Sequence, residues 1–231
     1  MFKKTVLTFA FLTILTTFYG FNANFSTSVT DDLLTTNGAD YAASLLGSGD
    51  FVISAYDNVI RNISEKEGND WRLMSAIAYH ESRFKPNITS RSGARGLMQI
   101  MPSVARQFDV APASVSDPET NVWLANKLMS KIMNSLQLPL DTSERDRMSI
   151  TLACYNGGIG HVSDARRLAR FHGEDPNSWE VVARYLSLKA DPAYYQNEVV
   201  KCGRFTGIRQ TRAYVDDVIG RYDKYCRITS R

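Results

Sequence analysis

The chain has 231 residues, with 27 Lys and Arg against 24 Asp and Glu, 44% hydrophobic residues and 11% aromatic residues. This apolar content is enough for one buried core, and 22% charged residues with only 14 Gly and 7 Pro exclude collagen-like and intrinsically disordered chains. A net charge of +3, with Lys and Arg scattered along the sequence, argues against a nucleic-acid partner. We therefore expect one globular domain that does not bind nucleic acid.

Residues 1–23 differ in character from the rest of the chain. Lys3 and Lys4 precede an uncharged, apolar stretch over residues 5–21, which is the pattern of a secretory signal. Phe21 makes the cleavage site poor, so a cleaved signal peptide and a retained N-terminal membrane anchor both stay open. Either one predicts an exported protein of the periplasm or cell envelope, with membrane association if the segment is retained.

The rest of the chain divides into a short arm and one domain. Residues 24–49 are polar and rich in Ser, Thr, Gly and Ala without a steady period, so we predict a linker. Residues 50–231 show helical spacing of apolar side chains and almost no alternation with period two, which predicts an all-α domain.

Capping and breaking residues predict where its helices start and stop. A first helix follows Asp50 and stops at Gly68, a second is capped by Asp70 and closed by Pro86, and Pro102 opens a short one. Asp-Pro pairs supply a capping carboxylate and a favourable first helical residue, and they predict three more starts, at residues 117–118, 175–176 and 191–192. Helical spacing also covers residues 144–155, 161–172 and 208–228.

Three cysteines, Cys154, Cys202 and Cys226, allow one disulfide at most. A long predicted helix separates Cys202 from Cys226, so we expect reduced, packed thiols.

No metal or other cofactor is implied. The HESRF segment, which begins at His80, lacks the second histidine of a zinc metalloprotease because Phe84 stands at that position. The sequence also lacks a G-x-S-x-G elbow and a G-x-x-x-x-G-K phosphate loop.

Glu81 is the candidate catalytic residue. It lies in the last turn of a predicted helix with apolar neighbours, where partial burial and the negative end of the helix dipole both disfavour the charged carboxylate. We therefore expect a raised pKa, as a general acid requires. The alternative is a surface glutamate that pairs with Arg83 or Lys85.

Four segments in order resemble the catalytic domain of family 1 lytic transglycosylases, which have the goose-lysozyme-like fold. They are the E-S of residues 81–82, the G-L-M-Q of 96–99, the Y-N-G of 155–157 and the Y-V of 214–215. The resemblance covers residues 50–225 and is greatest to the membrane-bound F type. That type also carries an N-terminal solute-binding-like domain, for which this chain has no room, so we expect a stand-alone catalytic module.

The resemblance implies that Glu81 cleaves peptidoglycan glycan strands between N-acetylmuramic acid and N-acetylglucosamine. Glu81 would protonate the glycosidic oxygen and then take the proton of the muramoyl 6-hydroxyl, which closes a 1,6-anhydro ring. Since no water needs activation, the second carboxylate of ordinary glycosidases can be absent.

The first two motifs imply further roles. Ser82 would orient Glu81 through a hydroxyl hydrogen bond. Gly93 and Gly96 would allow the tight backbone that brings the G-L-M-Q segment to the cleft. Met98 would pack on a sugar and Gln99 would hydrogen-bond to it, although core packing is the commoner fate of a methionine.

The last two motifs imply that Tyr155 places a phenol near the acid, that Asn156 places an amide near the substrate, and that Tyr214 lines the cleft. The family usually has Glu-Thr ahead of this tyrosine, and here the pair is Gln210-Thr211. The missing charge puts one supporting contact in doubt.

Two other functions compete. A hydrolytic muramidase on the same fold would need a base across the cleft, for which Asp109 and Asp117 are the nearest candidates. A non-catalytic peptidoglycan-binding or assembly module would keep the fold and lose the chemistry, which the intact E-S and G-L-M-Q motifs argue against. Envelope-spanning machinery is a further candidate partner, through residues 24–49.

Overall fold

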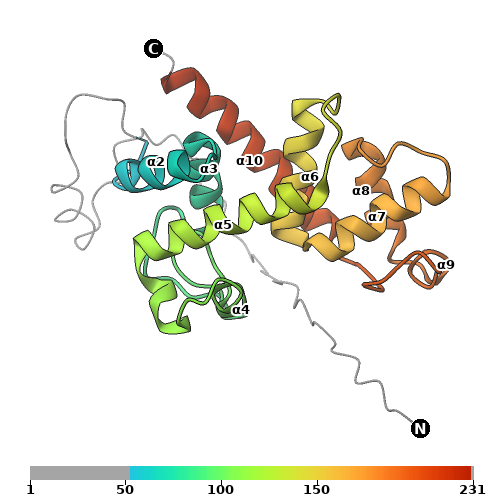
Figure 1. Cartoon of the computed structure of the whole chain (residues 1–231), viewed down its shortest axis with the longest axis horizontal. Coiled ribbons are helices and arrows are strands. Elements are labelled where there is room, and N and C mark those ends of the chain that lie inside the picture. Colours follow the sequence, from blue (N-terminus) through green and yellow to red (C-terminus); the bar gives the residue numbers. More distant parts are fainter. Residues whose placement is uncertain (1–52, 230–231) are drawn as a thin grey trace, which may run out of the picture.

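The computed structural model describes residues 53–229, and these residues confirm the predicted all-α fold (Figure 1). The only extended pairing within this range consists of two isolated bridges, from Arg95 to Thr89 and to Ile100. The elements are α2 (Asp57–Lys66), α3 (Trp71–Ser82), α4 (Pro102–Arg106), the 3-10 helix η2 (Pro112–Ser116), α5 (Pro118–Leu136), α6 (Glu144–Gly157), α7 (Ile159–Phe171), α8 (Trp179–Leu188), α9 (Pro192–Tyr195) and α10 (Ile208–Thr229).

Three predicted helix starts are confirmed by their caps. The carboxylates of Asp70, Asp117 and Asp191 each accept a backbone N–H of the first turn, at 2.8–2.9 Å, and α3, α5 and α9 follow them. Such a bond satisfies one of the N–H groups that a helix start leaves without an intrahelical partner. The short helix that Pro102 opens is confirmed as well.

The predicted start at Asp175-Pro176 is wrong, because α8 begins only at Trp179. Asp175 instead accepts the N–H of Asn177 in a turn. The guanidinium of Arg166 holds this turn, since it donates to the Pro176 carbonyl at 3.0 Å and to the Asn177 side chain at 2.8 Å. A buried tertiary contact thus decides the local conformation.

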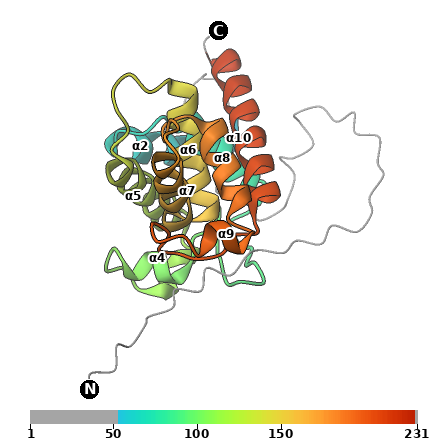
Figure 2. The same cartoon turned by 90° about the vertical axis from the view of Figure 1, so that its right-hand side faces the viewer.

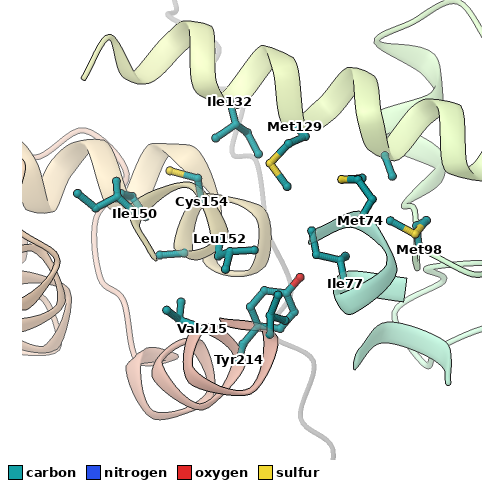
Figure 3. Close-up of a cluster of buried hydrophobic side chains, with 14 of the residues drawn as sticks. Met74, Ile77, Met98, Met129, Ile132, Ile150, Leu152, Cys154, Tyr214 and Val215 are labelled. Carbon is teal, nitrogen blue, oxygen red and sulfur yellow. The ribbon is translucent and has the colours of Figure 1, made fainter. Parts of the chain in front are cut away.

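α5 runs along the domain in Figure 1 and packs against α2 and α6. α6 lies in the middle of the domain in Figure 2 and packs against α5, α7, α8 and α10. In Figure 1, α2, α3 and α4 lie at one end of α5, and α7, α8 and α9 lie at the other. α10 packs against both α3 and α6, and so joins the two ends. Figure 3 shows the core where they meet, with Met74 and Ile77 of α3 facing Leu152 of α6 and Tyr214 of α10.

Several predictions fall outside the described residues, namely the signal peptide or anchor of residues 1–23, the linker of residues 24–49 and the capping role of Asp50. Within residues 53–229, no helix combines the length and hydrophobicity that a membrane span needs. None of the three cysteines, which all lie in the described range, is in a disulfide, and only Cys154 is buried, whereas Cys202 is exposed and Cys226 is intermediate.

Candidate active site

Glu81 lies in the last turn of α3 and is half-buried. The helix ends one residue later, at Ser82, because Arg83 and Phe84 both adopt the left-handed conformation, with φ of 55° and 59°. Two successive non-glycine residues in this region are unusual and costly, and such backbone strain concentrates at functional sites. The turn leads the chain away from α3 and leaves Glu81 at the end of the helix.

Burial raises the pKa of the Glu81 carboxyl from 4.5 to about 8, which confirms the expected direction. The hydroxyl of Tyr214 acts in the opposite sense and stabilises the carboxylate. No other acidic side chain among residues 53–229 contributes to this pKa. The site therefore contains one carboxyl group that stays protonated at neutral pH.

Two tyrosines approach Glu81 from α6 and α10. The pKa values of Tyr155 and Tyr214 both lie well above the usual value, because the hydroxyls are buried and the negative charge of Glu81 opposes a second one nearby. The Tyr155 hydroxyl donates to the Met98 carbonyl at 3.1 Å. The Tyr214 hydroxyl is buried without a hydrogen bond of normal geometry in the described chain, and Figure 3 shows it pointing from α10 toward α3.

The G-L-M-Q segment is a tight loop, as its glycines predict. Gly93 and Gly96 have φ of 88° and 78°. Gln99 also has a positive φ, and its amide donates to the Gly96 carbonyl at 3.0 Å. The Met98 side chain has no exposed surface, so its thioether lies in the core and its carbonyl, rather than its sulfur, reaches the site through Tyr155.

Asn121 of α5 holds this loop, and the sequence reasoning missed it. Its side chain accepts the Met98 N–H at 2.7 Å and donates to the carbonyls of Arg95 at 2.9 Å and Val115 at 2.8 Å. A Cβ atom on Gly96 would lie 2.6 Å from the Asn121 amide nitrogen, which explains why glycine is needed there. Asparagine is a poor helix former, and its presence in the predicted helix after Pro118 was the only sequence feature that could have indicated this role.

Two predicted contacts have other partners in the structure. The Ser82 hydroxyl donates to the Ala78 carbonyl at 3.1 Å, one turn back along α3, and not to Glu81. The Asn156 side-chain oxygen accepts from the hydroxyl of Thr211 at 3.0 Å. Thr211 is buried and Gln210 is exposed, so the threonine of the Gln210-Thr211 pair provides the supporting contact.

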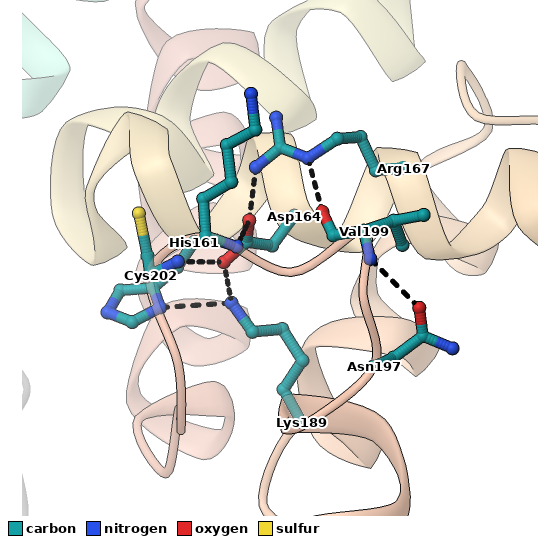
Figure 4. A network of polar contacts seen from close by, with 8 residues as sticks. His161, Asp164, Arg167, Lys189, Asn197, Val199 and Cys202 are labelled. Atoms are coloured by element: carbon teal, nitrogen blue, oxygen red, sulfur yellow. Dashed lines mark hydrogen bonds and ion pairs between the residues drawn. The ribbon is translucent and has the colours of Figure 1, made fainter.

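A buried ionic network fixes the chain on the α6–α7 side of the site (Figure 4). Asp164 pairs with Lys189 at 2.6 Å, contacts Arg167, and accepts the N–H groups of residues 201 and 202 at 2.8 Å. The segment held in this way leads to Phe205, whose ring lies within 3.3 Å of where a Gly157 Cβ would stand. The network therefore packs the loop before α10 against the Tyr155–Gly157 motif.

The two aspartates considered as the base of a hydrolytic reaction, Asp117 and Asp109, lie in a helix cap and in an exposed turn. Asp117 caps α5 and accepts both the N–H and the hydroxyl of Thr120, at 2.8 and 2.7 Å. Asp109 is exposed in the turn that follows α4, with φ of 56°. Neither one acts on the pKa of Glu81.

This all-α domain, in which one carboxyl group with a raised pKa lies near two tyrosines and a G-L-M-Q loop, has a lysozyme-like fold. Residues 58–177 match the transglycosylase SLT domain, so the chain belongs to this family.

The chain is similar to curated relatives named membrane-bound lytic murein transglycosylase F. The relative from Alkalilimnicola ehrlichii, named F 1, is 36% identical over 140 residues, which cover 61% of this chain and 28% of the relative. The relative from Marinobacter nauticus is 33% identical over 174 residues, which cover 75% and 33%. The chain thus spans about a third of the length of these relatives.

Among solved structures, an inactive mutant of the lytic transglycosylase Slt from Pseudomonas aeruginosa superposes with a TM-score of 0.51 at 20% identity, covering 74% of this chain and 24% of that one. This likeness confirms the fold class.

Proposed function

We propose that this domain is a peptidoglycan lytic transglycosylase that cleaves the bond between N-acetylmuramic acid and N-acetylglucosamine and leaves 1,6-anhydro ends. The observation that carries the proposal is the single Glu81 carboxyl, with a pKa of about 8, between Tyr155 and Tyr214. Membership of the SLT family and the names of the curated relatives support it.

The raised pKa suits one group for two proton transfers. At pH 7 a carboxyl with a pKa of about 8 is protonated in roughly nine of ten molecules. Glu81 donates this proton to the glycosidic oxygen as the bond from that oxygen to C1 breaks. The carboxylate then takes the proton of the 6-hydroxyl while O6 bonds to C1, so Glu81 is regenerated and no water is consumed.

The neighbouring side chains suit this cycle. The Tyr214 hydroxyl lowers the pKa of Glu81, so it stabilises the carboxylate that the first transfer leaves. The Asn156 side-chain oxygen accepts from Thr211, so the Asn156 NH2 group is left to donate to the substrate. The Gln99 NH2 group donates to Gly96, so the Gln99 side-chain oxygen is left to accept from the substrate. We assign direct sugar contacts to Asn156 and Gln99. The buried Met98 thioether has no such role.

The deciding experiment is mass spectrometry of purified peptidoglycan digested by the wild-type protein and by Glu81→Gln. Anhydro-muropeptides from the wild type alone are the expected result. Products with reducing ends would show hydrolysis and overturn the lyase reaction. No products from a correctly folded wild type would instead favour a non-catalytic binding module.

We also propose that the protein is exported, with the N-terminal segment as signal or anchor, and that residues 24–49 bind envelope machinery. The basis is the charge and hydropathy pattern of residues 1–23, together with relatives named membrane-bound. Fractionation of cells that produce the full chain tests it, since recovery from the cytosol would contradict export. Deletion of residues 24–49 without any change in localisation or activity would contradict the partner role.

A further inference from the structure

His80 precedes the candidate acid in the sequence and has no part in the reaction described so far. Successive residues of an α-helix are about 100° apart around its axis, so the side chains of His80 and Glu81 leave α3 in different directions. His80 lies against α10, where its ring meets Tyr214 and its Nε2 atom is 3.7 Å from the carboxylate of Asp217. The imidazole therefore links the last turn of α3 to the part of α10 that carries Tyr214.

The contact between His80 and Tyr214 is a specific one between two rings. Their centroids are 4.6 Å apart and their planes are at 75°, which is the edge-to-face geometry that aromatic rings prefer. The His80 side chain is 33% exposed and Tyr214 only 1%, so the imidazole covers the tyrosine at the border of the core. Among residues 53–229, no other ring forms a stacked or edge-to-face pair with Tyr214.

The Tyr214 ring depends on such packing, because its own hydroxyl does not fix it. The hydroxyl is buried and forms no hydrogen bond of normal geometry within the described part of the chain, although it stabilises the Glu81 carboxylate. Its distance from the acid is therefore set by the side chains that pack against the ring. These are core residues such as Ile77 and Leu152 (Figure 3), together with the imidazole of His80.

His80 does not act on the acid through a charge. Burial lowers the pKa of its imidazole, against the opposing effect of the exposed carboxylate of Asp217. The guanidinium groups of Arg83 and Arg221 lower this pKa further. The imidazole is thus neutral near pH 8, where Glu81 titrates, and it does not contribute directly to the pKa of that carboxyl. An effect of His80 on the acid must pass through the tyrosine.

We propose that His80 is a positioning residue, which holds the Tyr214 ring so that its hydroxyl stays directed at Glu81. This role rests on the proposed function, because it assumes that Glu81 is the acid. Without the ring contact the phenol moves away, so the carboxylate loses a stabilising group and its pKa rises. The sign is diagnostic, because a structural defect that admits water to the acid lowers this pKa instead.

The test is the pKa of Glu81 in the full chain, followed by the NMR shift of the side-chain carboxyl carbon that is missing in Glu81→Gln. Tyr214→Phe should raise this pKa by about one unit, because it removes a hydroxyl that stabilises a buried charge. His80→Leu and His80→Gln, which lack a ring, should each raise it by about half a unit. His80→Phe keeps a ring and should restore the wild-type value. In the Tyr214→Phe background, His80→Leu should add nothing, since both changes act through one hydroxyl.

His172→Leu is the matched control, because His172 also packs against a tyrosine, Tyr185 of α8, with the ring centroids 5.5 Å apart. It should leave the pKa of Glu81 unchanged. An unchanged or lowered pKa in both ring-free His80 variants, or an equal rise in the control, would overturn the positioning role.

Kinetics give a second readout of the same role. In His80→Leu, the fall of kcat/KM at alkaline pH on soluble glycan strands should move to higher pH by the same half unit. A fall that moves to lower pH would contradict the positioning role. Failure of the wild type to form anhydro ends would instead refute the proposed function, while the NMR titration would still decide whether His80 acts on Glu81. The two failures are therefore distinguishable.

Discussion

Replacing Glu81 by Gln should stabilise the protein, and the gain should grow with pH. The native carboxyl has a pKa of about 8, whereas the unfolded chain releases the proton near 4.5. Between these values the native state holds more protons than the unfolded state, so wild-type stability falls as pH rises. At 1.36 kcal/mol per pKa unit, the loss reaches about 3 kcal/mol at pH 7 and about 5 kcal/mol above pH 8. Glutamine does not titrate, so the variant escapes this loss.

Thermal unfolding of both proteins from pH 4.5 to 9 measures the effect. For a domain of this size, 1 kcal/mol corresponds to about 2–4 °C, so Glu81→Gln should melt about 6–12 °C above the wild type at pH 7 and close to it at pH 4.5. Glu65→Gln, at an exposed position of α2, controls for the loss of one negative charge. A difference in Tm that does not change with pH would refute the assignment of a half-buried acid with a raised pKa.

The remaining predictions concern the pH dependence of activity and the residues that support the site. Wild-type kcat/KM should fall about tenfold per pH unit above pH 8, as the acid loses its proton, in a pH–rate profile on soluble glycan strands. Asn121→Ser should lower kcat and shift this fall to lower pH, because water then reaches the acid. The control is Asn126→Ser, which changes a second buried asparagine of α5 that bonds to Val122 and Asn69 instead. It should lower Tm only. Gly96→Ala should cost about 3 kcal/mol in urea unfolding, through its left-handed backbone and the clash with the Asn121 amide. Asp164→Asn should cost about 3–5 kcal/mol in the same assay, because it leaves a buried lysine without its partner; a loss below 1 kcal/mol would contradict the burial of that pair.

The helices were predictable wherever their signals are local. Asp70, Asp117 and Asp191 cap helices because a short side chain can reach the N–H groups of the next turn without help from the rest of the fold. The same signal failed at Asp175, where Arg166, a residue of another helix, binds the following turn and delays α8 to Trp179. Local capping rules do not include such a contact.

In the candidate site, too, the sequence predicted some features and not others. The motifs named Glu81, Tyr155 and Tyr214, and the position of Glu81 at the end of an apolar helix was enough to predict the direction of its pKa shift. The partners of Ser82 and Met98 were not predictable, because a hydroxyl can bond back to its own helix and a methionine can turn into the core without any change in sequence pattern.

Sequence alone determined the helical fold class, the acid and the order of the motifs, because helical periodicity, end-capping and short catalytic motifs are all encoded within a few neighbouring residues. Only the tertiary structure decided which groups surround that acid. Asn121 joins α5 to the Met98 loop, the Met98 carbonyl holds Tyr155 of α6, and Tyr214 arrives from α10. These residues are 23 to 116 positions apart in the chain, and only the packing of the helices brings them together, so no local pattern could reveal their contacts.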